Sequence, residues 1–157
     1  MSGRLANILC ALSIPLRIYL GLVFILAAVY KIADPYSFGL SIATYDILPL
    51  SLINLMAVML PWVEVLVGVT LIIGLWTRAS ALAIAGMMIM FIIAVLIALS
   101  KDLHMSCGCF ASAEAGEEIS SGTVVRDLLW LAGAAYVLVV DDGRFGLDRF
   151  FSESPVP

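Results

Sequence analysis

The sequence predicts an all-α, polytopic membrane protein built as a bundle of four transmembrane helices. Of its 157 residues, 63% are hydrophobic and only 13% are charged, whereas a soluble domain carries about 25% charged residues. Four long apolar stretches lack the alternation that is typical of barrel strands. Because only helices and closed barrels satisfy the backbone inside lipid, we expect one membrane domain, residues 1–157, that crosses the bilayer four times.

Each apolar stretch can be compared with the roughly 20 residues that a helix needs to cross the hydrocarbon. The predicted helices comprise about residues 14–32, 51–76, 79–99 and 123–140. The third contains no charged residue and meets this length outright. The first and fourth have shorter uncharged cores, so we expect Arg17, Lys31 and Arg126 to snorkel toward the headgroups.

Turn-forming residues separate the four stretches. Asp34-Pro35 is expected to end the first helix, because proline has no amide to donate. Ser120-Ser121-Gly122 offers capping oxygens before the fourth helix. A polar loop, residues 100–122, joins the third and fourth helices, and residues 141–157 form a polar tail.

Basic residues predict the orientation, because cytoplasmic loops are enriched in Lys and Arg. With four spans both termini lie on one side, and that side carries Arg4, Arg17, Arg78, Arg144 and Arg149. The other side carries Lys31, Lys101 and Arg126. We therefore expect a bacterial inner membrane protein with cytoplasmic termini and an extracytoplasmic loop. The net charge of −4 argues against nucleic acid as a partner and leaves membrane lipid.

Cys107-Gly108-Cys109 in this loop is the pattern that points most directly to chemistry. A glycine between the cysteines eases the turn that brings their Cα atoms within the roughly 7 Å of a disulfide. The small ring is expected to be strained and easily reduced. His104 lies three residues upstream, and a protonated imidazole favours the reactive thiolate. We predict Cys107 and Cys109 as a catalytic pair assisted by His104.

Two other interpretations of the loop stay open. The cysteines are either inert loop thiols, or they bind a metal together with His104 and a fourth ligand from elsewhere. Our prediction assigns no metal. Cys10 is expected to be a lone, inert thiol, because some 30 Å of hydrocarbon separates it from the loop.

Glu64 places a carboxylate inside the second span, where a charge is costly unless it is paired or functional. Pro61 deprives one carbonyl of its helical partner, so we expect a kink and a small polar pocket beside Glu64. If ionised, Glu64 needs a partner among Arg17, Lys31 and Arg126. Two roles stay open: a catalytic proton relay coupled to thiol or quinone chemistry, and a hydrogen bond between helices.

Four charged residues are expected to gather at the extracytoplasmic face, namely Lys31, Asp34, Arg126 and Asp127. We predict that Lys31 and Arg126 bind a cofactor or stabilise a thiolate electrostatically. The alternative is a solvated ion cluster that sets the depth of the helices.

The order of these residues resembles a known family. The shared elements are Arg17, Gly21, Phe24, Lys31, Asp34-Pro35, Leu48-Pro49, Pro61-x-x-Glu64-x-x-x-Gly68, Cys107-Gly108-Cys109-Phe110 and Arg126-Asp127. Over about residues 14–140 they resemble the methylamine utilisation protein MauE family, within the wider DoxX-like group of four-helix membrane proteins. The Cys-Gly-Cys-Phe element is the most specific part. The family pattern continues with glycine, whereas this chain has Ala111 and an acidic insert, Glu114–Glu118.

The resemblance implies a role in forming or shuttling disulfides in extracytoplasmic proteins. Vitamin K epoxide reductase, which is similar in architecture, uses two cysteine pairs and a quinone. This chain has one outer pair, so it needs an extracytoplasmic thioredoxin-like or substrate protein, a quinone acting directly at the pair, or another membrane subunit. We therefore predict a membrane-embedded thiol-disulfide redox protein, with thiol-disulfide oxidoreductase as its enzyme class.

The alternative is a non-catalytic subunit or anchor of a larger membrane complex, with Cys107 and Cys109 structural or ligating. Four glycines would support close helix contacts within or between subunits: Gly21, Gly68, Gly86 and Gly133. A transporter is the weakest interpretation, because few polar groups lie inside the spans.

Overall fold

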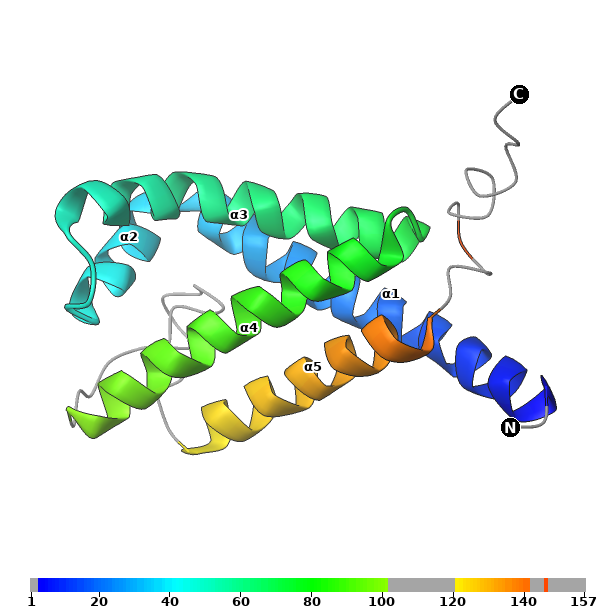
Figure 1. Ribbon diagram of the computed structural model, residues 1–157. Helices are drawn as coiled ribbons and strands as arrows, with labels where there is room; N and C mark the ends of the chain where they lie inside the picture. Colours follow the sequence, from blue (N-terminus) through cyan, green and yellow to red (C-terminus); the bar gives the residue numbers. More distant parts are fainter. Residues whose placement is uncertain (1–2, 102–120, 142–145, 147–157) are drawn as a thin grey trace, which may run out of the picture.

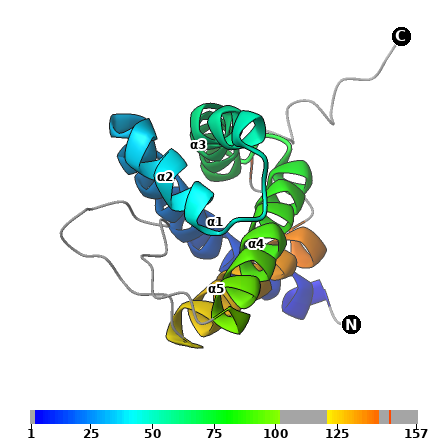
Figure 2. The same ribbon diagram turned by 90° about the vertical axis from the view of Figure 1, so that its left-hand side faces the viewer.

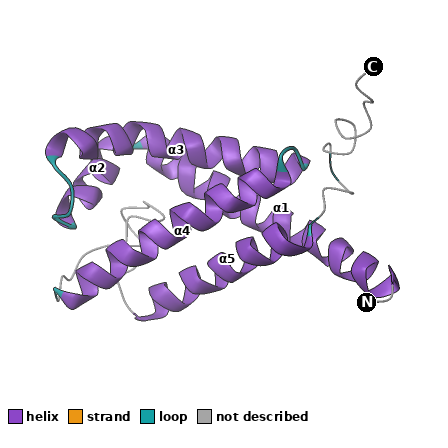
Figure 3. Cartoon of the chain, viewed as in Figure 1, coloured by secondary structure: helices purple, strands orange, loops and turns teal. Residues whose placement is uncertain are grey.

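The computed structural model describes residues 3–101, 121–141 and 146, and this part of the chain contains helices and no strand. The helices are α1 (Gly3–Ala33), α2 (Pro35–Thr44), α3 (Leu50–Ile73), α4 (Thr77–Ser100) and α5 (Ser121–Val140) (Figure 1). Short turns join α1 through α4 (Figure 3). Residues Cys10–Ala33 of α1 and the whole of α3, α4 and α5 are long and apolar enough to cross a membrane. The predicted class, a multi-pass helical membrane protein, is confirmed.

The first helix and its junction with α2 differ from the sequence-based expectation. α1 begins at Gly3 rather than near residue 14, and it continues through Pro15. Asp34-Pro35 ends α1 as expected, but it also starts a short helix that was not predicted. The Asp34 carboxylate accepts a hydrogen bond from the Ser37 amide at 3.0 Å, and Pro35 occupies a position where no amide is needed. The hydrogen bonds from Ser37 lower the pKa of Asp34.

Helices α1 and α3 form the most extensive helix pair, followed by α4 and α5. A Cβ on Gly21 would lie 2.8 Å from the Gly68 carbonyl oxygen, and a Cβ on Gly68 would lie 2.9 Å from the Gly21 carbonyl oxygen. The two backbones therefore touch at a point that only glycine allows. Gly133 makes ordinary contacts, whereas a Cβ on Gly86 would meet nothing within 4 Å.

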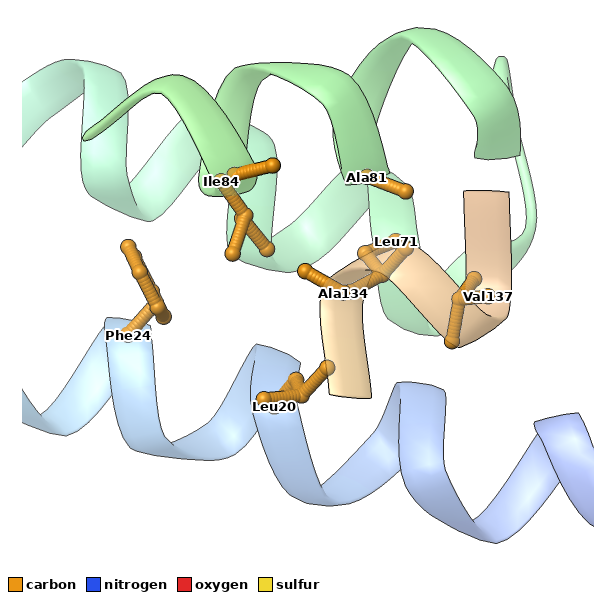
Figure 4. Packing of buried hydrophobic residues seen from close by; sticks show 8 residues of the cluster. Leu20, Phe24, Leu71, Ala81, Ile84, Ala134 and Val137 are labelled. Atoms are coloured by element: carbon orange, nitrogen blue, oxygen red, sulfur yellow. The ribbon is translucent and has the colours of Figure 1, made fainter. Parts of the chain in front are cut away.

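The centre of the bundle is a hydrophobic core to which all four long helices contribute. Its labelled residues are Leu20, Phe24, Leu71, Ala81, Ile84, Ala134 and Val137 (Figure 4). Many large apolar side chains instead face outward, including Leu66, Leu82 and Leu129, each more than half exposed. A surface this apolar is stable only against lipid, which is therefore the surroundings of the bundle.

The bundle has two distinct ends. At the loop end, α4 ends at Ser100, α5 begins at Ser121, and α2 lies beside α3 (Figure 2). At the terminal end lie the α3–α4 turn and Asp141, the residue after α5 (Figure 1). The turn begins at Gly74, whose φ of 75° favours glycine. α4 starts at Thr77, two residues before the predicted start at residue 79.

Candidate functional site

A buried ion pair joins α1 to α3 in the loop-end half of the bundle. Lys31 Nζ lies 2.6 Å from Glu64 Oε1, and each residue is only 6% exposed. The Lys31 ammonium also lies 5.0 Å from the centroid of the Phe38 ring, which links α2 to the pair. Of the three cations considered for Glu64, Lys31 is the partner. Lys31 is thus paired inside the bundle and does not snorkel to the headgroups.

The second oxygen of Glu64 has a different environment. Within the described part of the chain, no donor forms a hydrogen bond with the buried Glu64 Oε2. α3 runs as one helix through the buried Pro61. The polar neighbour of Glu64 is the Lys31 ammonium on Oε1, which is one of the partners that the sequence left open.

A cavity of about 290 Å³ opens beside this pair at the loop end. All five described helices contribute to its wall, which is mostly apolar. Charged or hydroxylated side chains enter the wall at few points: Lys31, Ser41, Tyr45, Glu64 and Asp127. The cavity therefore combines apolar walls with a few polar groups, the usual character of a small-molecule site.

The first turns of α5 bring a second charged pair to this cavity. Asp127 is 1% exposed, and Arg126 Nε lies 3.4 Å from its Oδ1. The Arg126 guanidinium lies 4.9 Å from the centroid of the Trp130 ring. Burial raises the pKa of Tyr45 to about 12, and the negative charge of Asp127 acts in the same direction.

The expected outer cluster is thus assembled in part. Lys31 and Asp127 line one cavity, and Arg126 adjoins Asp127. Asp34 instead lies on the surface, where it caps α2 through Ser37.

A second buried ion pair, which the sequence did not predict, lies at the terminal end. Arg17 Nη1 lies 3.0 Å from Asp141 Oδ2, and Arg17 Nε donates to the Leu71 carbonyl oxygen at 3.2 Å. Ser13 Oγ donates to the same Asp141 oxygen at 2.8 Å. These bonds join α1, α3 and the end of α5, so Arg17 does not snorkel either. The sequence placed Asp141 in the polar tail. What could have predicted the pair is an acidic residue directly after a span, at the same end of the bundle as Arg17.

Three predicted catalytic residues, His104, Cys107 and Cys109, lie outside the described residues. Among the residues that the structure does describe, Cys10 is buried without a disulfide partner. No group of three or more His, Cys, Asp or Glu side chains suited to a metal occurs among them either.

Comparison with known proteins gives one family. The family model described as "Methylamine utilisation protein MauE" matches residues 7–140. A curated protein, the methylamine utilization protein MauE of Paracoccus denitrificans, is 30% identical to this chain over 118 residues. The match covers 74% of this chain and 63% of that protein, so the chain spans less than two thirds of the relative's length. No solved structure matches the chain.

Proposed function

The chain belongs to the methylamine utilisation MauE family, and from that premise we propose that it is a membrane-embedded thiol-disulfide redox protein that serves methylamine utilisation. The observation that carries the proposal is the Cys107-Gly108-Cys109 pattern between α4 and α5. A pair of thiols one residue apart, in a polar segment between two spans, is suited to exchange with proteins at the membrane surface.

The proposed chemistry is thiol-disulfide exchange through a mixed disulfide. A thiolate of the substrate protein attacks the Cys107–Cys109 disulfide, and one cysteine leaves as a thiolate. The second substrate thiolate then attacks the mixed disulfide, which forms the substrate disulfide and leaves both cysteines reduced. Two electrons and two protons pass to this chain. His104 assists the thiolate, and a thioredoxin-like protein, a quinone or another membrane subunit reoxidises the pair.

The loop end supports this proposal through its charged groups. The helix ends that flank the cysteine segment, Ser100 and Ser121, lie at the same end as the cavity. Arg126 lies in the second turn of α5 with a partly exposed side chain, so it is the cation that we propose for thiolate stabilisation. Lys31 is buried and bound to Glu64, which favours a role for Lys31 in the cavity wall.

Of the two roles open to Glu64, its geometry favours the bond between helices over the proton relay. A 2.6 Å contact between α1 and α3 is what an inter-helix bond requires. A proton relay remains part of the proposal only if Glu64 exchanges protons with the cavity that it lines.

The proposal is tested by removing the outer thiols from the full-length protein in cells. We expect Cys107→Ser/Cys109→Ser to abolish disulfide formation in a reduced extracytoplasmic reporter protein while the variant still inserts into the membrane. Cys10→Ser is the matched control, because it removes a buried thiol at the other end of α1, and it should retain activity. Unchanged transfer by the double variant contradicts the redox function and favours the non-catalytic membrane subunit.

A further inference from the structure

The cavity at the loop end has an interior suited to an apolar molecule. Its volume of about 290 Å³ lies just below the ~300–1,000 Å³ range of small-molecule sites. Four helices contribute aromatic rings to its wall: Phe24, Phe38, Phe91 and Trp130. Because a polar solute would lose its hydration against such walls, the favoured occupant has an apolar body.

Glu64 adds one specific requirement to this apolar site. Its Oε1 is bound to Lys31 Nζ at 2.6 Å, whereas no described residue donates to the buried Oε2. An ionised carboxylate only accepts hydrogen bonds, and a buried acceptor without a donor is unfavourable. Glu64 lines the cavity, although its Oε2 is itself covered, so an occupant with a donor beside its apolar body would satisfy this oxygen by turning the carboxylate toward the cavity.

We infer that the cavity binds a lipid-soluble molecule with an apolar body and a hydroxyl group that donates to Glu64 Oε2. Phenols and the reduced, dihydroxy forms of membrane quinones belong to this class. The carbonyl oxygens of an oxidised quinone only accept hydrogen bonds, so at this oxygen the site favours the reduced form. The inference extends the proposed function to a ligand class but rests on Glu64 and the cavity, not on the cysteines.

The test compares two probes that share an apolar body and an ether or hydroxyl oxygen: one oxygen carries a donor hydrogen, and the other carries a methyl group in its place. Binding of para-pentylphenol and of its methyl ether to the purified full-length protein is measured by equilibrium dialysis at fixed detergent concentration. We expect the phenol to bind about tenfold more tightly or better, because a hydrogen bond to a charged group is among the stronger ones. Lys31→Met/Glu64→Leu removes the acceptor without leaving a lone charge, and it should bind both probes equally.

Matched variants locate the site. Thr70→Val removes a hydroxyl that lies 2.8 Å from Ser80 Oγ, away from the cavity, and it should keep the preference for the phenol. Ala27→Leu places a larger side chain in the cavity wall and should weaken both probes.

Three results would overturn the inference: equal affinity of the wild-type protein for phenol and ether, a preference that survives Lys31→Met/Glu64→Leu, or phenol binding unaffected by Ala27→Leu. The comparison of phenol with ether in the wild type and the test of Ala27→Leu leave the ion pair unchanged. They therefore test the inference even if Lys31→Met/Glu64→Leu does not fold. Cys107→Ser/Cys109→Ser should bind the phenol as the wild type does, which separates this inference from the redox proposal.

Discussion

Two buried carboxylates each hold a cation of α1 inside the bundle. Glu64 binds Lys31 in the loop-end half, and Asp141 binds Arg17 at the terminal end. Removing either member of such a pair leaves a buried charge without its partner. Breaking either pair is costly, even where forming it adds little net stability. The two pairs therefore hold α1 in place against α3 and the end of α5.

The Lys31–Glu64 pair gives a prediction at the residue scale. Glu64→Leu should lower the free energy of unfolding by about 3–5 kcal/mol, because it leaves the Lys31 ammonium unpaired, whereas Lys31→Met/Glu64→Leu should be nearly neutral or stabilising. Denaturation of the purified variants in detergent, followed by circular dichroism, measures both changes. If the double variant were as unstable as Glu64→Leu, Lys31 and Glu64 would not be each other's main partners.

Tyr45 gives a prediction about pH. Its pKa is raised to about 12, first by burial and then by the charge of Asp127, against an unfolded value near 10. The folded state therefore favours the neutral phenol, so this contribution to stability is complete below pH ~10 and is lost as the pH rises toward ~12. Spectrophotometric titration of wild type and Tyr45→Phe should show one fewer late-ionising tyrosine in the variant. Identical titration curves would contradict the assignment.

At the scale of elements, the Gly21–Gly68 contact sets how closely α1 and α3 approach. Gly21→Ala or Gly68→Ala should lower stability by about 1–3 kcal/mol, because the added methyl group meets a backbone carbonyl that cannot move aside. Gly86→Ala adds the same methyl group where nothing lies within 4 Å, so it should be neutral or slightly stabilising. Thermal unfolding of the three variants side by side checks this, and equal losses at all three positions would contradict the contact.

Whether a helix could be predicted from the sequence depends on whether its signal lies in neighbouring residues. The four spans follow from length and the scarcity of charge, and these properties are local. α2 was missed because ten residues are too few to cross a bilayer and because Asp34-Pro35 was interpreted only as the end of a helix. Its signal was a cap, Asp34 followed three residues later by Ser37, with proline at the first helical position.

The pairing of buried charges is a property of the whole molecule, and the sequence left it open. Three cations were equally eligible for Glu64, because the choice depends on which helices touch and in what register. The contact of α1 with α3 at Gly21 and Gly68 decides that register and brings Lys31 to Glu64. Asp141 was overlooked for the same reason, since its partner lies 124 residues away along the chain. The chemistry predicted for His104, Cys107 and Cys109 stays a prediction.

The orientation of the chain in the membrane is also a property of the whole molecule. Arg17 and Lys31 are buried inside the bundle, so neither belongs to the loops in which basic residues are counted. Among the other basic residues, four spans predict Arg4, Arg78, Arg144 and Arg149 on the side of the termini, against Lys101 and Arg126 on the side of the 100–122 loop. The bias still favours a cytoplasmic terminal end, and we propose that the loop end faces the extracytoplasmic space.

Single cysteines introduced at the two ends test this orientation in a background where Cys10, Cys107 and Cys109 are serine. Tyr36→Cys replaces an exposed side chain on α2 at the loop end, and Ala79→Cys replaces an exposed one beside the α3–α4 turn. A membrane-impermeant maleimide should label Tyr36→Cys in intact cells and Ala79→Cys only after permeabilisation. The reverse pattern would place the cysteine segment in the reducing cytoplasm, where a lasting disulfide is disfavoured, and would remove the physical basis of the redox proposal.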